Sequence, residues 1–211
     1  PFVDYKDVIY NMPQPTLILL CKRPAYGVGK QRLANKLGEE IALQIAQALL
    51  ACALEDFLIW PGRLVISPAS GRDQDWALNL CHQTPQMHRR SDIEVIPQHE
   101  GNLGQRLNSL DKTLRESGHH QLIYIGSDAP DLGIADFMAA SKALLNTDTV
   151  LKPTIDGGVS IMASRKPWPD LTELPWSTEK LCQNLSALCQ DYGHSINTLS
   201  KGFDVDEVED L

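Results

Sequence analysis

The stretch QLIYIGSDAPDL, residues 121–132, gives the strongest indication of the fold. Its apolar run, residues 122–126, has the length and composition of a β-strand that is buried on both faces. Two carboxylates follow this run, and such groups at a strand end either cap the next helix or hold a positive charge. We expect Asp131 to cap a helix that begins near Gly133. Asp128 comes too early to cap, and we expect it to contact a metal ion or a ribose.

Similar short apolar runs alternate with stretches of helical period along the rest of the chain. The other runs that suit strands are residues 16–21, 63–67, 93–96, 149–153, 159–164 and 195–200. Between them, apolar residues recur every three or four positions, which predicts helices over residues 33–52, 72–80, 103–114, 133–145 and 181–188. This alternation predicts an α/β fold of three layers, with a mostly parallel sheet between two layers of helices. Ligands of such folds bind beyond the carboxyl ends of the strands, where Asp128 is expected.

Composition limits the kind of protein. The chain has 211 residues, and we expect a loose N-terminal arm over residues 1–15 and a single nucleotide-binding domain over residues 16–211. A net charge of −8 argues against a nucleic acid or an anionic membrane as partner. We find no apolar run that approaches the length of a membrane span. The five cysteines form no paired motif, so we expect free thiols and a cytoplasmic protein.

The loop after the first strand is unusually basic. Within CKRPAYGVGKQRLA, residues 21–34, and the turn that follows lie five of the 19 basic residues of the chain, Lys22, Arg23, Lys30, Arg32 and Lys36. Glycines in the same loop let backbone N–H groups approach a ligand, and a phosphate or pyrophosphate is the expected occupant. A solvated basic loop is the alternative. The stretch matches neither a Walker loop nor the dinucleotide fingerprint, which argues against a dinucleotide-dependent oxidoreductase.

Two later stretches add acidic groups. In PTIDGGVS, residues 153–160, Asp156 precedes a pair of glycines, which fits either a tight hairpin turn or a close approach to a ligand. The segment FDVDEVEDL, residues 203–211, contains five acids among nine residues. Such a run is usually a solvated tail. Asp204 or Asp206 could instead supply a second carboxylate to the cation held by Asp128.

Six stretches in this order resemble the nucleotide-diphospho-sugar transferase superfamily, which has the GT-A fold. They are KRPAYGVGKQRLA, PQHEGNLGQRL, YIGSDAPDL, KPTIDGGVSIMAS, LPWST and FDVDEVEDL, and together they extend the resemblance over about residues 16–211. Within the superfamily the chain looks most like a glycosyltransferase-like group, also labelled selenodomain-associated transferases. Guanylyltransferases that act on the molybdenum cofactor or on phospholactate resemble it more distantly.

The resemblance implies a nucleotide or nucleotide-sugar donor, a small-molecule acceptor, and Mg²⁺ or Mn²⁺ as the cofactor. By similarity, Asp128 and Asp156 would be catalytic, and Asp128 and Asp206 would bind the metal. The residues that would bind the substrates are Lys22, Gly29, Lys30, Arg32, Arg106, Gly157 and Gly158.

The chain also departs from the family pattern. The family usually has Thr, an acid, Glu and an aromatic residue where this chain has Gln31, Asn102, Gln105 and Val159. These departures could retune the pocket or signal lost catalysis. We therefore expect a metal-dependent, glycosyltransferase-like transferase, with two alternatives on the same fold. One is a nucleotidyltransferase of the guanylyltransferase type, and the other is a non-catalytic nucleotide-binding protein.

Overall fold

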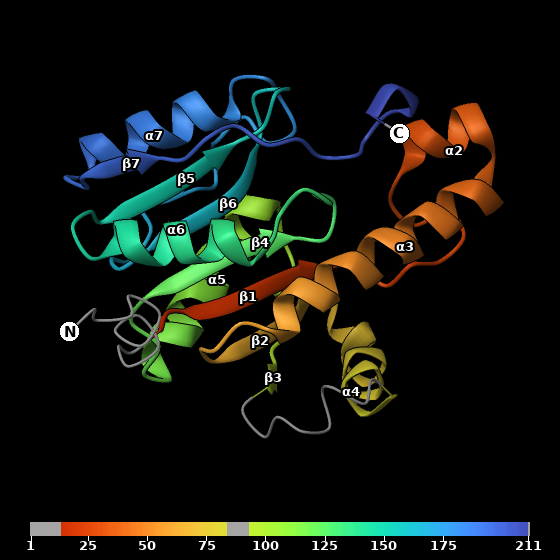
Figure 1. The fold of residues 1–211 in the computed structure, drawn as a ribbon, viewed down its shortest axis with the longest axis horizontal. Helices are drawn as coiled ribbons and strands as arrows, with labels where there is room; N and C mark the ends of the chain where they lie inside the picture. Colours follow the sequence, from red (N-terminus) through yellow and green to blue (C-terminus); the bar gives the residue numbers. More distant parts are fainter. Residues whose placement is uncertain (1–13, 84–92, 211) are drawn as a thin grey trace, which may run out of the picture.

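A seven-stranded sheet forms the centre of the protein, in a computed structural model that describes residues 14–83 and 93–210 (Figure 1). The strands are β1 (Thr16–Cys21), β2 (Leu64–Pro68), β3 (Ile93–Val95), β4 (Leu122–Gly126), β5 (Thr149–Pro153), β6 (Val159–Ser164) and β7 (Ile196–Thr198). Their order is β3-β2-β1-β4-β6-β5-β7, and β6 runs antiparallel to its neighbours β4 and β5, whereas the other pairs are parallel. The predicted α/β class with a mostly parallel sheet is confirmed. Most of the expected N-terminal arm, residues 1–13, lies outside the described residues.

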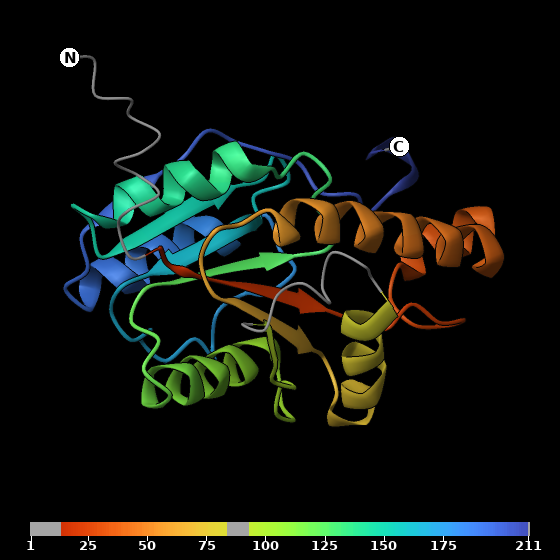
Figure 2. The ribbon, with the colours of Figure 1, turned by 60° about the horizontal axis from the view of Figure 1, so that its bottom comes forward.

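Helices cover both faces of the sheet. They are α2 (Gln31–Leu37), α3 (Glu39–Leu58), α4 (Gln74–Gln83), α5 (Leu103–Glu116), α6 (Ile134–Leu144) and α7 (Leu181–Asp191), with short 3₁₀ turns η1 (Gly71–Asp73) and η3 (Val208–Asp210). Apolar side chains of α3, α4 and α6 form the core on one face, and those of α5 and α7 form the core on the other. Figure 2 shows α3 and α6 on one side of the strands and α5 on the opposite side.

The prediction of one continuous helix over residues 33–52 is wrong. The chain breaks at Gly38, whose φ of +90° is in the left-handed region that favours glycine, and α2 and α3 form separately on either side. Buried Leu33 on α2 and Leu49 on α3 still pack together with Val205 of the C-terminal segment. Much of α2 and the first half of α3 therefore project beyond the sheet, next to the C-terminus (Figure 1).

The role expected for Asp131 as a helix cap is also wrong. Helix α6 starts after Gly133, whose N–H donates to the Asp136 carboxylate at 3.2 Å. Asp131 instead accepts a hydrogen bond from the backbone N–H of Phe203 at 3.3 Å. It fastens the C-terminal segment to the loop after β4, a contact between residues 72 positions apart that no local pattern could indicate.

Among the described residues, α3 is long and apolar enough to cross a membrane by length and composition alone, which differs from the expectation that no apolar run approaches that length. One such helix is weak evidence, because a core helix of a soluble protein passes the same test. Its residues Leu50, Leu54 and Phe57 pack against the sheet.

Two buried histidines lie at the amino ends of strands, away from the ligand-binding edge. Nδ1 of His119 lies 2.8 Å from the Thr16 hydroxyl, and Nδ1 of His194 lies 2.8 Å from the Thr149 hydroxyl. Burial lowers the pKa of both imidazoles below the usual value, and nearby Arg63 and Lys166 act in the same direction. Both rings are therefore harder to protonate in the folded protein than in the unfolded chain, although Glu94 and Asp148 partly oppose this effect.

We expect these histidines to make the protein less stable in mild acid. A folded-state pKa below the unfolded value of about 6.5 means that the unfolded chain takes up protons first, so stability present above that pH falls as the pH drops. Urea unfolding between pH 7.5 and 5 should show this loss in the wild type relative to a double His119→Gln, His194→Gln variant. Asp204, whose raised pKa of about 6 acts in the opposite direction, is common to both proteins. His120→Gln, at an exposed neighbouring position, serves as the control. An equally steep dependence in the double variant would contradict the explanation.

Candidate functional site

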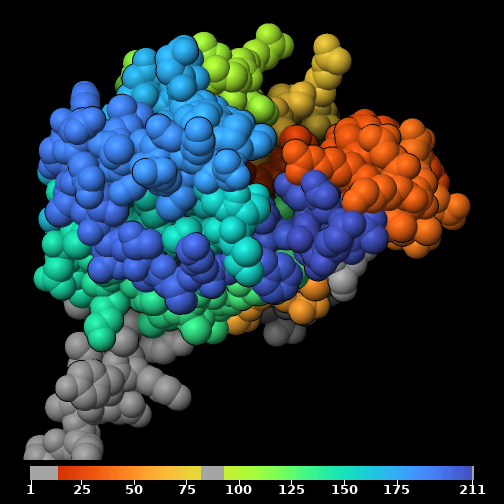
Figure 3. All heavy atoms as spheres, turned by 90° about the horizontal axis from the view of Figure 1, so that it is seen from above, coloured from red at the N-terminus to blue at the C-terminus, as the bar shows by residue number. Residues whose placement is uncertain are grey.

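A cleft of about 460 Å³ lies at the carboxyl ends of β1 and β4. Figure 3 shows a hollow where the segment before α7, the C-terminal segment and the chain leading into α2 meet. The residues predicted for the site that line this cleft are Lys22, Gly29, Lys30, Arg32, Arg106, Asp128, Asp156, Gly158 and Asp206. Residues from distant parts of the chain are thus brought to one cavity, at the edge where ligands of α/β proteins bind. Their chemical roles remain predictions.

The basic loop reaches the cleft through a tightly turned backbone. Gly27 and Gly29 have φ values of +71° and +67°, and Lys30 also lies in the left-handed region, with φ of 48°. The Gln31 side chain donates to the Gly27 carbonyl at 2.9 Å and so stabilises the turn, which gives a structural role to one departure from the family pattern. A left-handed non-glycine residue costs on the order of 1 kcal/mol or more. The contacts made by Lys30 must therefore hold its backbone in place.

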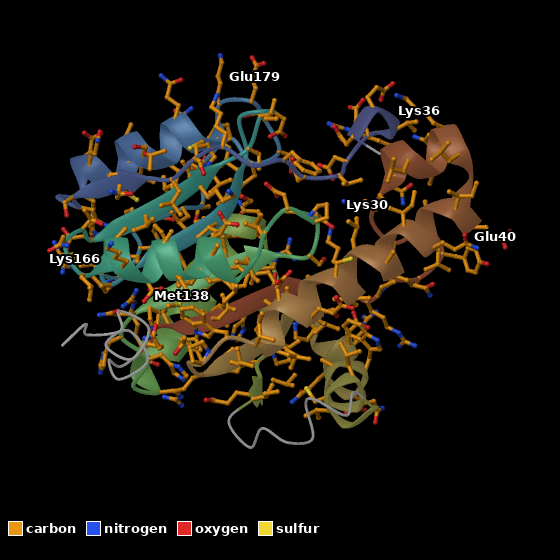
Figure 4. All side chains as sticks on the ribbon, viewed as in Figure 1. Lys30, Lys36, Glu40, Met138, Lys166 and Glu179 are labelled. Carbon is orange, nitrogen blue, oxygen red and sulfur yellow. The ribbon has the colours of Figure 1, made fainter. Side chains whose placement is uncertain are left out.

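Lys30, labelled in Figure 4, is the central charged group of the site, and its side chain is 6% exposed. Its ammonium lies 3.0 Å from Oδ1 of Asp128 and 3.0 Å from Oδ1 of Asp206, and it also donates to the Val205 carbonyl. Hydrogen bonds to Asp206 and to the Val205 carbonyl use two of the three N–H donors of the ammonium, and the contact with Asp128 is an ion pair. A phosphate would therefore compete with two carboxylates for Lys30.

More carboxylates than Lys30 can neutralise face the cleft. Asp156 and Asp204 line it together with the partners of Lys30. Asp156 accepts hydrogen bonds from the Thr154 hydroxyl and from the Gly158 N–H, so it also fixes the turn between β5 and β6. Burial, together with the charges of Asp156 and Asp206, raises the pKa of the Asp204 carboxyl to about 6. Cationic side chains and carboxylates are equal in number along the cleft, but Asp204 lies close enough to Asp156 and Asp206 for their charges to oppose its ionisation, which a cation bound among these carboxylates would relieve.

The oxygen ligands present fit a hard divalent cation. Asp128 and Asp206 each use one carboxylate oxygen for Lys30, and their Oδ2 atoms make no hydrogen bond or ion pair among the described residues. In the described part of the chain no cluster of three or more acidic, histidine or cysteine side chains could hold a metal alone. Mg²⁺ is commonly bound by one or two carboxylates together with water and substrate phosphate oxygens. An ion at this site would share its ligands with the substrate in that way.

The acidic C-terminal segment is not only a solvated tail. Glu207 accepts from Arg32 at 3.2 Å, and Lys36 contacts Glu209 at 3.0 Å and Glu207 at 3.7 Å. These exposed pairs contribute roughly 0 to 1 kcal/mol each. They do engage Arg32, whereas Lys22 lines the cleft without an ion pair in the described part of the chain.

The segment that precedes α7 forms the opposite wall, and sequence reasoning assigned no role to it. Trp176, Ser177 and Thr178 line the cleft. Lys30 and Ser177, with φ of 62°, are the described non-glycine residues with positive φ, and both line this cavity. Such outliers gather at functional sites. The motif LPWST was the available signal, although it indicated only a family resemblance.

Gly157 supports this wall rather than lining the cleft. Its φ is +90°, and a Cβ placed on it would lie 2.0 Å from the carbonyl oxygen of Glu179. Its own carbonyl accepts from the Cys182 N–H at 3.0 Å. The turn between β5 and β6 therefore packs directly against the start of α7 through this glycine.

The two amides that replace family acids form a helix cap. Asn102 accepts from the Gln105 N–H at 3.0 Å, and the Gln105 side chain accepts from the Asn102 N–H at 3.0 Å. This reciprocal capping box satisfies two donors at the start of α5. The Asn102 amide also donates to the Thr172 carbonyl at 3.1 Å, which an ionised acid could not do. Neither residue lines the cleft, so these substitutions have a structural explanation that does not involve catalysis.

Asn102→Ala should therefore lower stability without changing ligand binding. Loss of such a cap costs about 1 kcal/mol. For a chain of this size we expect a fall in melting temperature of about 2 to 4 °C. Asn35→Ala, at an exposed position in α2, is the control and should cause no such fall. Weaker nucleotide binding at unchanged stability would show instead that Asn102 serves the site.

Comparisons with known proteins agree with this architecture. The bacterial family DUF2064, described as an uncharacterized protein conserved in bacteria, matches residues 52–178. A candidate nucleotide-diphospho-sugar transferase from Desulfovibrio desulfuricans G20 superposes with a TM-score of 0.80, at 21% identity over 93% of this chain and 84% of that one. A search of curated proteins finds no match.

Two further structures are similar at lower scores. A cytidylyltransferase from Leptospira borgpetersenii has a TM-score of 0.60, at 12% identity over 94% of this chain and 84% of that one. Rv0371c from Mycobacterium tuberculosis, solved in complex with manganese, has a TM-score of 0.50, at 16% identity over 94% and 96%. At these identities the likeness shows the fold, which is the one expected from the sequence.

Proposed function

Since the chain belongs to the DUF2064 family and has the fold of nucleotide-diphospho-sugar transferases, we propose that it is a metal-dependent transferase. Its donor is a nucleotide or a nucleotide-diphospho-sugar, and its chemistry is glycosyltransferase-like. The most direct support is that the Lys30 ammonium lies 3.0 Å from a carboxylate oxygen of both Asp128 and Asp206 at one cleft. The charge balance and the unpaired cysteines favour a cytoplasmic enzyme without a nucleic-acid partner.

In this proposal, cations and loop amides hold the donor diphosphate. Lys22 can bind a phosphate without giving up an ion pair in the described part of the chain. Lys30 and Arg32 could bind one by exchanging a carboxylate partner for a phosphate. Asp128 and Asp206 hold Mg²⁺ or Mn²⁺ through their available oxygens. When bound, the ion neutralises charge on the leaving group, a contribution of several kcal/mol to the transition state. The manganese in the Rv0371c structure supports a divalent ion.

Nucleotidyl transfer is the second candidate. The similarity to a cytidylyltransferase favours it, and the same set of ligands would serve attack at phosphorus as well as at an anomeric carbon. A non-catalytic nucleotide-binding protein has less support, since the amides at Asn102 and Gln105 form a helix cap. Products separate the two enzymatic candidates, because nucleotidyl transfer from a triphosphate releases pyrophosphate and glycosyl transfer releases the nucleotide part of the donor.

A thermal-shift panel tests the proposal. Nucleoside triphosphates and nucleotide-sugars are added with Mg²⁺, Mn²⁺ or a chelator. A ligand at 100 times its dissociation constant adds about 2.7 kcal/mol. This stabilisation should raise the melting temperature by roughly 5 to 10 °C. We expect such shifts for a subset of the donors and only in the presence of metal. Absence of any shift with all donors and both metals would overturn the proposal.

A further inference from the structure

The cleft has an apolar wall that the donor proposal does not use. The apolar side chains on it are Leu103 and Leu107 of α5, Val159 and Met162 of β6, Trp176, and Leu181 of α7. The ion-paired groups of the cleft, around Lys30, come from other elements, namely the loops after β1 and β4 and the C-terminal segment. The two kinds of surface therefore meet in one cavity but are built from different parts of the fold.

Trp176 presents a fixed aromatic surface on this wall. Its indole N–H donates to the Leu171 carbonyl at 3.1 Å, so the only polar atom of the ring is already satisfied. Its backbone N–H donates to the Leu174 carbonyl at 2.8 Å, and Gly157 packs against the chain three residues later. The ring is partly exposed in the cleft and offers a face or edge to an apolar or planar group.

Arg106 lies three positions after Leu103 on α5, about one turn along the helix, and its side chain lines the cleft together with Leu103 and Leu107. Its Nε atom is buried and has no hydrogen-bond partner, and its Nη1 makes only a long contact of 3.5 Å with the Gln98 side chain. A buried unpaired donor on a permanently charged group is costly. Arg106 also lines a neighbouring groove formed by residues 69–72 and 98–101, so an anion can reach it.

We propose that this part of the cleft binds a second substrate that is a small amphipathic organic anion. Its apolar or planar body packs on Trp176 and the leucines of α5, and its carboxylate or phosphate pairs with Arg106. Guanidinium groups bind both anions through two parallel hydrogen bonds. The cavity of about 460 Å³ is in the range of small-molecule sites, which favours a compact molecule over a polymer. Its assignment as the acceptor rests on the proposed transferase function, whereas the binding preference does not.

Binding of simple probes tests the inference without a known acceptor. The probes are phenyl phosphate and 3-phenylpropionate as amphipathic anions, benzyl alcohol as a neutral aromatic, and inorganic phosphate and acetate as anions without an apolar body. Calorimetry or ligand-observed NMR should show that the first pair binds at least tenfold more tightly than the other three. Equal affinities across the panel would overturn the inference.

Three variants locate the site. In Arg106→Gln, the affinity for phenyl phosphate should fall to about the affinity that the wild type has for benzyl alcohol. In Trp176→Ala, it should fall to about the affinity that the wild type has for inorganic phosphate. Trp176→Phe should retain most of the binding, which guards against a folding defect in the alanine variant. Lys112→Gln removes a charge from an exposed position on the same helix and should bind as the wild type does. Wild-type affinity in both Arg106→Gln and Trp176→Ala would overturn the inference.

Competition with nucleotides separates this inference from the proposed function. If probes and a metal–nucleotide bind together, the inference is supported. If the nucleotide displaces the probes, and Trp176→Ala weakens nucleotide binding as much as probe binding, the wall serves the donor and the inference is overturned. Probe binding that follows Arg106 and Trp176 in a protein that binds no nucleotide would retain the site but reject the transferase proposal.

Discussion

Asp128→Asn should reduce kcat/KM for transfer by on the order of 10³-fold, because it removes a carboxylate charge from the proposed metal site. The change keeps the shape of the side chain, and the Asp128 carboxylate is about half exposed, so folding should be little affected. The variant also takes one acceptor charge from Lys30. Measurement of initial rates against metal concentration should show that excess metal restores little of the activity.

Asp131→Asn provides a matched control for this prediction. The residue lies three positions further along the same loop and accepts a hydrogen bond from Phe203, but it does not line the cleft. It should keep nearly full activity. If both variants lose activity alike, the loop rather than the metal is responsible. If Asp128→Asn keeps wild-type activity, the assigned role of Asp128 in catalysis is wrong.

Gly157→Ala should cause a large loss of stability. The added Cβ would lie 2.0 Å from the Glu179 carbonyl oxygen, which belongs to the backbone and cannot rotate away. Left-handed backbone strain and overpacking together should cost roughly 3 kcal/mol. We expect a fall in melting temperature of about 6 to 12 °C. Thermal unfolding followed by circular dichroism measures this directly.

Gly193→Ala separates the backbone strain from the steric part of that effect. Gly193 has a similar φ of +83°, but a Cβ there would meet no atom within 4 Å. This variant should therefore lose only the strain component, about 1 to 2 kcal/mol. Equal losses in the free energy of unfolding would mean that the start of α7 shifts to make room for the added methyl group. The segment that carries Trp176 would then be less rigid than its contacts indicate.

Much of the fold was predictable because its signals are local. The run at residues 122–126 is strand β4, and Asp128 does lie at its carboxyl end on the side of the cleft. The break at Gly38 was missed because the apolar period continues from Leu37 to Ile41 across it. Only the backbone geometry of the glycine reveals the turn.

The site was harder to predict because its contacts span the chain. The sequence indicated that Lys30 and Asp128 would share a cleft, but it did not indicate that the ammonium would lie between the carboxylates of Asp128 and Asp206. This arrangement depends on the left-handed backbone of Lys30 and on the path of the C-terminal segment. The role of Trp176 depends likewise on how the chain before α7 packs against Gly157.

The C-terminal segment runs across the carboxyl ends of the strands, from β5 to the loop after β4. Gly202 is hydrogen-bonded to Pro153 and Ile155 at the end of β5, and three residues later the Val205 N–H donates to the Asp128 carbonyl at 2.8 Å. Beyond that, η3 lies against α2. One backbone segment thus connects the two sides of the cleft, and they cannot move apart unless its hydrogen bonds at Gly202 or Val205 break. Slow hydrogen–deuterium exchange at the Val205 amide would report on this closure directly, whichever ligand occupies the cavity.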